Sequence, residues 1–218
     1  MEPVWWETSW IENVLDGLSS GQFAFLLPAG LFMVSMTITP GPNNVMLTAS
    51  GANYGFRRTL PHLFGIVGGC FVLFASIALG LGVVFERYPA LQAALKVVGS
   101  VYLVYLAWKI ATAPPPDLRV GDARPLTFVQ AAAFQFANPK AWVMGIALMA
   151  GFLPETGQPL LNALILAGVA EVVGLPCIAL WAGFGTAIGR LLTTDRAWRV
   201  FNGLMGALTA ACVVMILR

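Results

Sequence analysis

The sequence has very little charge. Only 10% of its 218 residues are Asp, Glu, Lys or Arg, whereas a typical soluble domain has about 25%. No charged residue and no histidine occurs between Asp16 and Arg57, and hydrophobic residues make up 58% of the chain, with a mean hydropathy of +0.80. Almost nothing remains for a water-soluble domain, so the composition indicates a polytopic membrane protein.

Residues that carry catalysis or bind metals are also scarce. Three cysteines, Cys70, Cys177 and Cys212, lie within apolar segments without metal-ligand spacing, which predicts small buried side chains. The one histidine, His62, lies beside Pro61, and we expect it to be solvated or to cap a helix. The chain has neither an H-E-x-x-H motif nor a P-loop. We therefore expect no enzyme activity, no metal or other cofactor, no nucleic-acid partner and no direct use of ATP.

Six apolar segments are long enough to cross a hydrocarbon core, which takes about 20 residues each. They lie near residues 22–45, 61–85, 89–111, 127–153, 160–183 and 197–217. A proline-rich and charged stretch at 113–126 separates two halves of three segments, 22–112 and 127–218. Residues 1–21 contain four acidic residues and no basic one. We predict that 1–21 is an interfacial segment on the outer face and that 113–126 is a cytoplasmic linker.

The placement of the basic residues predicts the orientation of the chain in the membrane. The first, third and fifth connections between segments hold eight of the twelve Lys and Arg residues. These eight are Arg57, Arg58, Lys109, Arg119, Arg124, Arg190, Arg196 and Arg199. By the positive-inside rule these connections face the cytoplasm, so both termini are expected to lie outside.

The long uncharged run is interrupted by a segment that breaks helices, which is made of Pro40, Gly41, Pro42, Asn43 and Asn44. Proline removes a backbone donor and clashes with the preceding turn. In lipid, such a break is tolerated only where the freed backbone groups face protein or a water-filled cavity. We predict that a second helix begins near Pro42, and that the free N–H groups after it and the two amides bind a carboxylate. The alternative is a structural kink whose asparagines cap the backbone.

A second break, Asn138-Pro139-Lys140, lies about midway along 127–153. Asparagine is a favoured N-cap and proline a favoured first helical residue, so these residues predict the start of a half-helix. Lys140 is expected to lie too deep to reach either surface and to act as a carboxylate or counter-ion partner. Gln135 precedes Asn138 by three residues, and we expect it to share the same face and contribute to the site.

Each half of the chain therefore begins with a span that proline breaks. Because three is an odd number, the two halves insert with opposite orientations. The predicted fold is all-α, with six transmembrane helices in two inverted three-helix repeats, and the first helix of each repeat is broken by proline. In secondary transporters of this pattern the substrate site lies between the two broken helices.

Glu171 is the only acidic residue well inside a predicted span. The residues on its helical face, Ala167, Gly168 and Gly174, are small, which directs Glu171 toward a neighbouring helix instead of lipid. A carboxylate inside the membrane is costly and usually functional. We predict that Glu171 binds a substrate ammonium group or carries a coupled proton. The alternative is a structural ion pair with Lys140.

The strings TPGPNNVMLTASGANYGFRRTL at 39–60 and FQFANPKAW at 134–142 resemble motifs of the LysE/RhtB family of bacterial amino-acid exporters. The resemblance extends over 22–218, and YLVYLAWKIATAPPP at 102–116 is most similar to the cysteine/O-acetylserine exporter branch. The resemblance implies a multi-pass protein of the bacterial cytoplasmic (inner) membrane that exports small zwitterionic amino acids or close derivatives. The sequence leaves open whether the chain acts as a monomer or as a homodimer.

Proton-coupled alternating access between the two repeats is the mechanism we expect. The alternative interpretation is a membrane channel, or an accessory or scaffold subunit without transport activity of its own. A channel would need a repeated charged or carbonyl-lined filter, and the sequence contains no such repeated motif.

Overall fold

The structure is a computed structural model that describes residues 24–81, 87–115, 124–154 and 158–214. These residues are helical and include no β-strand, which confirms the all-α prediction. The α-helices are α2 (Leu26–Ile38), α3 (Pro42–Tyr54), α4 (Phe56–Ser76), α6 (Pro89–Ala111), α7 (Phe128–Ala137), α8 (Pro139–Phe152), α9 (Pro159–Leu191) and α10 (Asp195–Ala211), and a π-helical turn η1 (Ile77–Leu81) follows α4. The interfacial segment predicted at 1–21 and the middle of the predicted linker lie outside the described residues.

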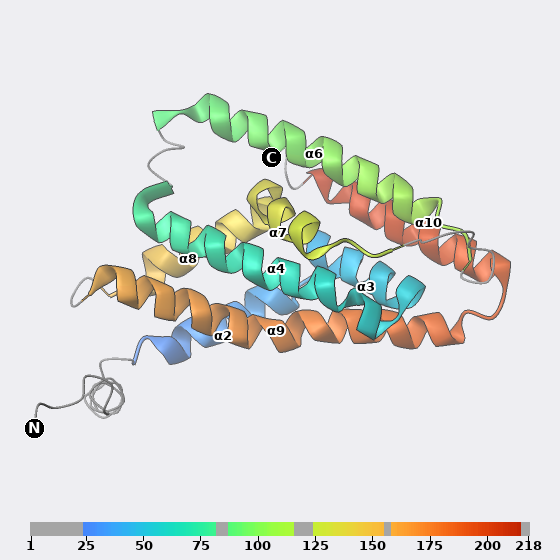
Figure 1. The fold of residues 1–218 in the computed structure, drawn as a ribbon, viewed down its shortest axis with the longest axis horizontal. Helices are drawn as coiled ribbons and strands as arrows, with labels where there is room; N and C mark the ends of the chain where they lie inside the picture. Colours follow the sequence, from blue (N-terminus) through green and yellow to red (C-terminus); the bar gives the residue numbers. More distant parts are fainter. Residues whose placement is uncertain (1–23, 82–86, 116–123, 155–157, 215–218) are drawn as a thin grey trace, which may run out of the picture.

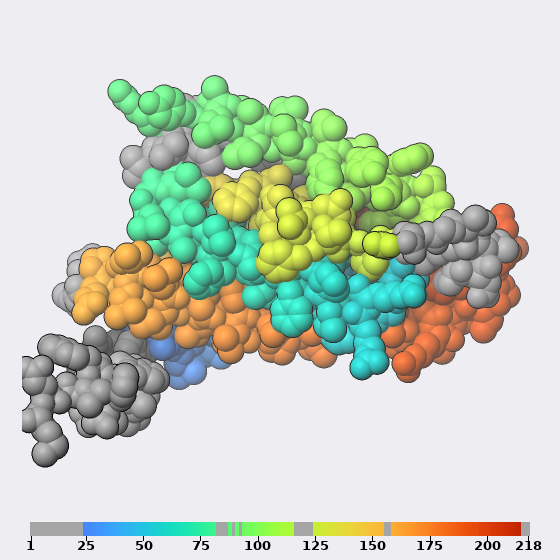
Figure 2. Space-filling view, viewed as in Figure 1, coloured from blue at the N-terminus to red at the C-terminus, as the bar shows by residue number. Residues whose placement is uncertain are grey.

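The surface of the described helices is apolar. Leu31 on α2, Val101 on α6 and Val172 on α9 have 63%, 66% and 73% of their surface exposed. Figure 2 shows α6 along one edge of the molecule, with much of its surface free of protein neighbours. Exposing this many large apolar side chains to water would be costly, whereas a bilayer covers them. The surface therefore supports a membrane protein.

Three of the described helical stretches are long and apolar enough to cross a membrane, namely Phe56–Leu81, Ala93–Ala111 and Pro159–Leu191. α2, α7 and α8 are shorter apolar helices. α2 continues into α3, and α7 into α8, across a proline break, so each of these pairs together has the length of one span. The inverted six-span arrangement as a whole stays a prediction.

The prolines break the chain where the sequence predicts. α2 ends at Ile38, Gly41 is extended, and α3 begins with Pro42 at its first helical position. α7 ends at Ala137, and α8 begins with Pro139 after Asn138 as the N-cap. Both predicted half-helix starts are confirmed.

Two helix boundaries differ from the prediction. α4 begins at Phe56 and contains Pro61, which was expected to start the segment. A proline removes only one hydrogen bond of the helix, so the chain continues through it when the packing supports the helix. α9 extends eight residues beyond the predicted end at 183, through Arg190 to Leu191. Its 33 residues span about 50 Å, more than the roughly 30 Å of a hydrocarbon core, so its length is not set by the apolar run alone.

The helices run roughly along the long axis of the molecule (Figure 1). The C-terminal ends of α3, α6 and α9 lie toward one end of the molecule, and η1 and the C-terminal end of α8 lie toward the other. Seven described basic residues belong to the first end: Arg57, Arg58, Lys109, Arg124, Arg190, Arg196 and Arg199. We call it the basic end. This segregation agrees with the predicted charge asymmetry, and which side faces the cytoplasm stays a prediction.

Helices from different halves of the chain pack with their backbones in contact. A Cβ atom added to Gly185 of α9 would overlap the backbone oxygen of Thr48 in α3. One added to Gly65 of α4 would overlap the backbone oxygen of Phe128 in α7. Glycine at these positions lets α3 approach α9, and α4 approach α7, more closely than any side chain would allow. This packing holds α3, which follows the first break, against α9, and α7, which precedes the second break, against α4.

Candidate functional site

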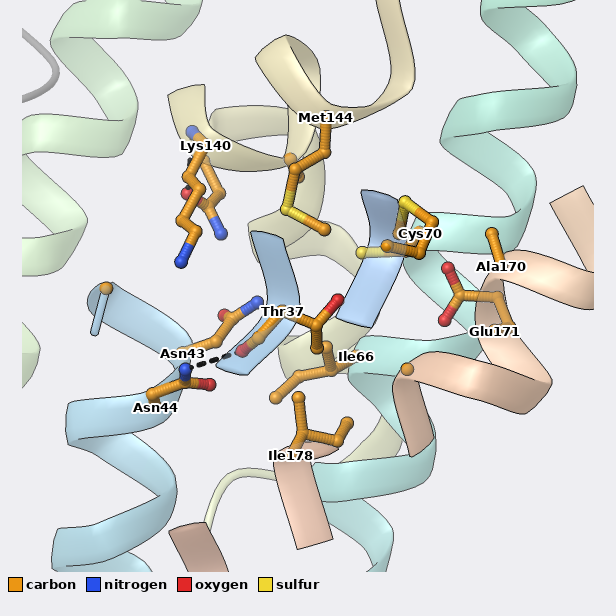
Figure 3. A pocket seen from close by; sticks show the side chains of 15 residues that line it. Thr37, Asn43, Asn44, Ile66, Cys70, Lys140, Met144, Ala170, Glu171 and Ile178 are labelled. Atoms are coloured by element: carbon orange, nitrogen blue, oxygen red, sulfur yellow. Dashed lines mark hydrogen bonds between the residues drawn. The ribbon is translucent and has the colours of Figure 1, made fainter. Parts of the chain in front are cut away.

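A cavity lies where the two helix breaks meet the middle of α4 and α9, and Figure 3 shows its 15 lining residues. Six of the residues predicted from the sequence line it: Gly41, Asn43, Asn44, Asn138, Lys140 and Glu171. They come from three separate parts of the chain, α3, α8 and α9 with the residues that precede them. The structure therefore gathers the two predicted breaks and the predicted intramembrane carboxylate around one space.

The N-terminus of α3 presents unpaired donors at this cavity. Gly41 has no side chain to cap the helix, Pro42 has no N–H, and the N–H of Val45 donates to the carbonyl of Gly41 at 3.0 Å. Within the described residues, the backbone N–H groups of Asn43 and Asn44 have no acceptor. Free N–H groups and the positive end of the helix dipole together attract an anion.

The side-chain amides of the two asparagines already bind protein groups. Asn43 and Gln135 exchange hydrogen bonds of 2.9 and 3.2 Å. Asn44 Nδ2 donates to the carbonyls of Thr37 and Thr39, at 2.9 and 2.8 Å, and so caps the end of α2. In this conformation the backbone N–H groups, and not these amides, are the free donors at the first break.

Lys140 reaches from the start of α8 to the end of α2. Its Nζ donates to the carbonyl and the hydroxyl of Thr39 at 2.7 and 2.9 Å, and to the carbonyl of Pro40 at 3.4 Å. A cation is favourable there because the last carbonyls of a helix carry partial negative charge. In the described part of the chain Lys140 and Glu171 form no salt bridge, so the alternative of a structural ion pair between them is wrong.

Four of the residues predicted for the site are absent from the cavity wall. Pro40, Pro42 and Pro139 shape the backbone at the two breaks. Gln135 is fully buried behind the wall, where its Oε1 accepts from Asn43 and, at 3.3 Å, from Asn138 Nδ2. The prediction that Gln135 shares a face with Asn138 is confirmed, and its contact with Asn43 makes it a positioning residue.

Glu171 faces the cavity from α9, opposite the start of α3 (Figure 3). No hydrogen bond or salt bridge to its carboxylate is found among the described residues. Most of the wall around it is apolar. An unpaired carboxylate in such surroundings requires a cation, a proton or a hydrogen-bond donor. The cavity thus has free donors on one side and a carboxylate on the other.

Sequence reasoning missed several residues of the wall. The hydroxyl of Thr37 is buried there and has no hydrogen-bond partner among the residues that the structure describes. Cys70, expected as a buried apolar side chain, also contacts Gln135 through its Sγ at 3.5 Å. The place of Thr37 in the last turn before the break was a signal that could have identified it. The spacing had already placed Gly174 on the helical face of Glu171. The other apolar members carried no such signal, and they are Met33, Ile66, Ala141, Met144, Ala170 and Ile178.

A cavity with two converging helix breaks and a carboxylate, inside apolar helices, is the architecture of a membrane transport protein. The chain belongs to the LysE type translocator family, which matches residues 34–217. It is 32% identical over 183 residues to the cysteine/O-acetylserine efflux protein of Escherichia coli (strain K12), and 34% identical over 186 residues to that of Salmonella paratyphi A. Each alignment covers 82% of this chain and 90% of the relative. No solved structure matches the chain.

Proposed function

We propose that this chain exports small amino acids or close derivatives from the cytoplasm, as a proton-coupled secondary transporter of the bacterial inner membrane. The observation that carries the proposal is the two-sided chemistry of the central cavity, with free N–H groups at Asn43 and Asn44 and a carboxylate at Glu171. The relatives are named cysteine/O-acetylserine efflux proteins, so cysteine and O-acetylserine are the first substrates to test.

A zwitterionic amino acid matches this wall in one orientation. Its carboxylate would accept from the N–H groups of Asn43 and Asn44, on the side where Lys140 adds positive charge. Its ammonium group would donate to Glu171 and to the unpaired hydroxyl of Thr37. The methionine and isoleucine side chains of the wall would contact a small apolar or weakly polar substituent.

Glu171 would couple transport to protons because one carboxylate cannot hold a proton and a substrate ammonium group together. A proton taken up on the outer side would release the amino acid there. The protonated carrier would return, release its proton to the cytoplasm and bind the next substrate molecule. Each cycle exchanges one amino acid for a proton moving inward.

Alternating access requires the cavity to open toward each side in turn. The glycine contacts of α3 with α9 and of α4 with α7 join helices from different halves of the chain. We therefore propose that these pairs move as units, and that the two three-helix halves do not rock past each other intact.

The test is uptake of labelled amino acids into everted membrane vesicles, with and without a proton gradient. The panel contains cysteine, O-acetylserine, threonine, homoserine, leucine, lysine and arginine. We expect saturable, gradient-dependent uptake of one or two of them. Glu171→Gln should abolish this uptake while leaving the amount of protein in the membrane unchanged. The matched control is Asp195→Asn, at an exposed carboxylate of α10 that lies 4.0 Å from Arg199.

Three results would contradict the proposal. Uptake by Glu171→Gln with unchanged kinetics at every pH would exclude this residue as the coupling group. Uptake that fails to saturate would indicate a channel, and no uptake of any amino acid would indicate an accessory subunit or a different solute.

A further inference from the structure

Gly174 is buried in the middle of α9 and forms part of the wall of the central cavity. Glu171, Gly174 and Ile178 lie on one face of this helix, because steps of three and four residues each correspond to about one turn. Figure 3 shows Glu171 and Ile178 on the α9 side of the cavity. Glycine weakens the interior of a helix relative to alanine, because it loses more conformational freedom on folding. A glycine at this place therefore has a cost that another property of the position must offset.

Close packing explains the other glycines that are buried within the described helices. A Cβ atom added to any of them would lie closer than 3.0 Å to an atom of a neighbouring helix, which real Cβ atoms essentially never do. They are Gly51, Gly65, Gly69, Gly99, Gly145, Gly185 and Gly206. Glycine is needed there because the helices could not otherwise approach each other.

Gly174 differs from all of these glycines. A Cβ atom added to it would lie 3.6 Å from Oγ1 and 3.7 Å from Cγ2 of Thr37, which is ordinary van der Waals contact. No other atom of a described helix that packs against α9 would lie within 4 Å of it. The packing therefore has room for a side chain at this position, and the space that glycine leaves empty belongs to the cavity.

This space lies beside the groups proposed to bind the ammonium end of an amino acid. Glu171 precedes Gly174 by about 4.5 Å along the helix axis, and the buried hydroxyl of Thr37 is the nearest group to the missing Cβ atom. With the ammonium group at Glu171 and Thr37, and the carboxylate at the N-terminus of α3, the side chain of the amino acid must lie against the apolar part of the wall. Gly174 and Ile178 form that part next to Glu171 on α9.

We propose that Gly174 determines the length of the substrate side chain that the central cavity accepts. The inference rests on the proposed function, from which it takes the orientation of the amino acid. A short side chain, such as that of alanine or cysteine, ends before it fills the space at Gly174. A longer one, such as that of norvaline or O-acetylserine, occupies this space. Gly174 is thus a specificity-determining residue that acts through the space it leaves and not through a polar contact.

A series of straight-chain amino acids tests this inference. Alanine, 2-aminobutyrate and norvaline have the same charged groups and differ only in the number of methylene groups. Each is added to the purified full-length protein, and the ligand-dependent rise in the unfolding temperature gives its Kd. Gly174→Ala should raise the Kd of norvaline about tenfold, because the added methyl group overfills the cavity. The Kd of alanine should change by less than about twofold, and that of 2-aminobutyrate by an intermediate factor.

The matched control is Gly168→Ala, the same substitution in the same helix. A Cβ atom added to Gly168 meets no atom within 4 Å, and this residue does not belong to the cavity wall. Gly168→Ala should leave all three Kd values unchanged. Without ligand, neither variant should lower the unfolding temperature, because alanine favours a helix more than glycine does. This measurement separates an effect on side-chain length from a loss of folding.

An equal rise of the Kd for all three amino acids in Gly174→Ala would overturn the inference, because the residue would then act on the shared charged groups. Unchanged Kd values in this variant, or the same change in Gly168→Ala, would overturn it as well. Vesicle uptake separates these results from a failure of the proposed export. Binding that depends on Gly174 in the expected way, without uptake of any amino acid, would refute export and leave the length selection standing. No rise in the unfolding temperature with any amino acid of the series or of the uptake panel would refute both.

Discussion

The two helix breaks share one sequence signal, a proline at the first position of a helix, but they leave different groups free. At the first break, Pro42 follows a glycine that cannot cap the helix, so two backbone N–H groups of α3 stay unpaired. At the second, Asn138 accepts from the N–H of Lys140 at 3.1 Å and caps α8. The first break therefore presents donors to a ligand, whereas the N-terminus of the second is satisfied by the protein itself.

The two breaks also differ in which side chains donate to the C-terminal carbonyl groups of the preceding helices, α2 and α7. The indole N–H of Trp181, on α9, donates to the carbonyl of Ile38 at the end of α2, where Lys140 of α8 also donates to Thr39. At the end of α7, the indole N–H of Trp142 donates to the carbonyl of Phe136 from the helix that follows directly. Besides Asn44, two side chains from the other half of the chain thus bind the end of α2, whereas the indole that binds the end of α7 comes from its own neighbour α8.

Among the variants that test the difference between the two breaks, the replacement of Lys140 should change the uptake kinetics most. Lys140→Met removes three hydrogen bonds from the end of α2 and the positive charge beside the free N–H groups of α3. A hydrogen bond to a charged group contributes about 1.5 to 3 kcal/mol, so kcat/KM for vesicle uptake should fall by about tenfold to a hundredfold. Lys140→Arg should recover part of the loss, because it keeps the charge.

The matched control is Lys96→Met, at an exposed position of α6. Both variants must first be shown to reach the membrane in equal amounts. Equal uptake kinetics in the two variants would mean that the first break does not depend on the lysine of the second.

The pair formed by Asn43 and Gln135 should give an intermediate effect, measured by a double-mutant cycle. Their side chains exchange two hydrogen bonds across 92 residues of sequence. Asn43→Ala leaves the fully buried Gln135 with an unmet hydrogen bond, and Gln135→Ala leaves Asn43 without this partner. We expect the double variant to be about as stable as the worse single variant, with a coupling free energy of about 1 to 2 kcal/mol. Thermal unfolding of the purified protein measures it, and additive losses would show that the pair does not act as one unit.

The parts of the site that the sequence predicted are those that local backbone chemistry decides. Pro42, Asn138 and Pro139 fix where two half-helices begin, because each acts on the hydrogen bonds of its own turn. Glu171 could be placed inside the protein because an isolated carboxylate in an apolar run has few alternatives. These predictions needed no knowledge of which helices are neighbours.

The contacts that the sequence could not predict join distant parts of the chain. Lys140 ends on the carbonyl of Thr39, 101 residues away, and not on Glu171. Lys140 and Glu171 are oppositely charged groups in broken or apolar spans, so composition alone left an ion pair between them open, whereas the packing of α8 against α2 decided the partner. His62, which is buried although we expected it to be solvated or to cap a helix, was misjudged for the same reason, since its burial depends on the helices that pack against α4, namely α3, α7 and α9, and a local pattern does not place them there.

The two tryptophans at the breaks, Trp181 and Trp142, allow the most closely matched pair of variants, and the expected effects are the smallest of those predicted here. Each donates its indole N–H to one carbonyl at a break, at 3.2 Å for Trp181 and 2.8 Å for Trp142, and each can be replaced by phenylalanine. A neutral hydrogen bond contributes about 0.5 to 1.5 kcal/mol, so both variants should lower the unfolding temperature by a few degrees. Only Trp181→Phe should also change the KM for uptake, by about twofold to fivefold, because Ile38 directly precedes the break that presents the free donors. If Trp142→Phe changes the KM as much, the second break also contacts the substrate, and the division of roles between the two breaks is wrong.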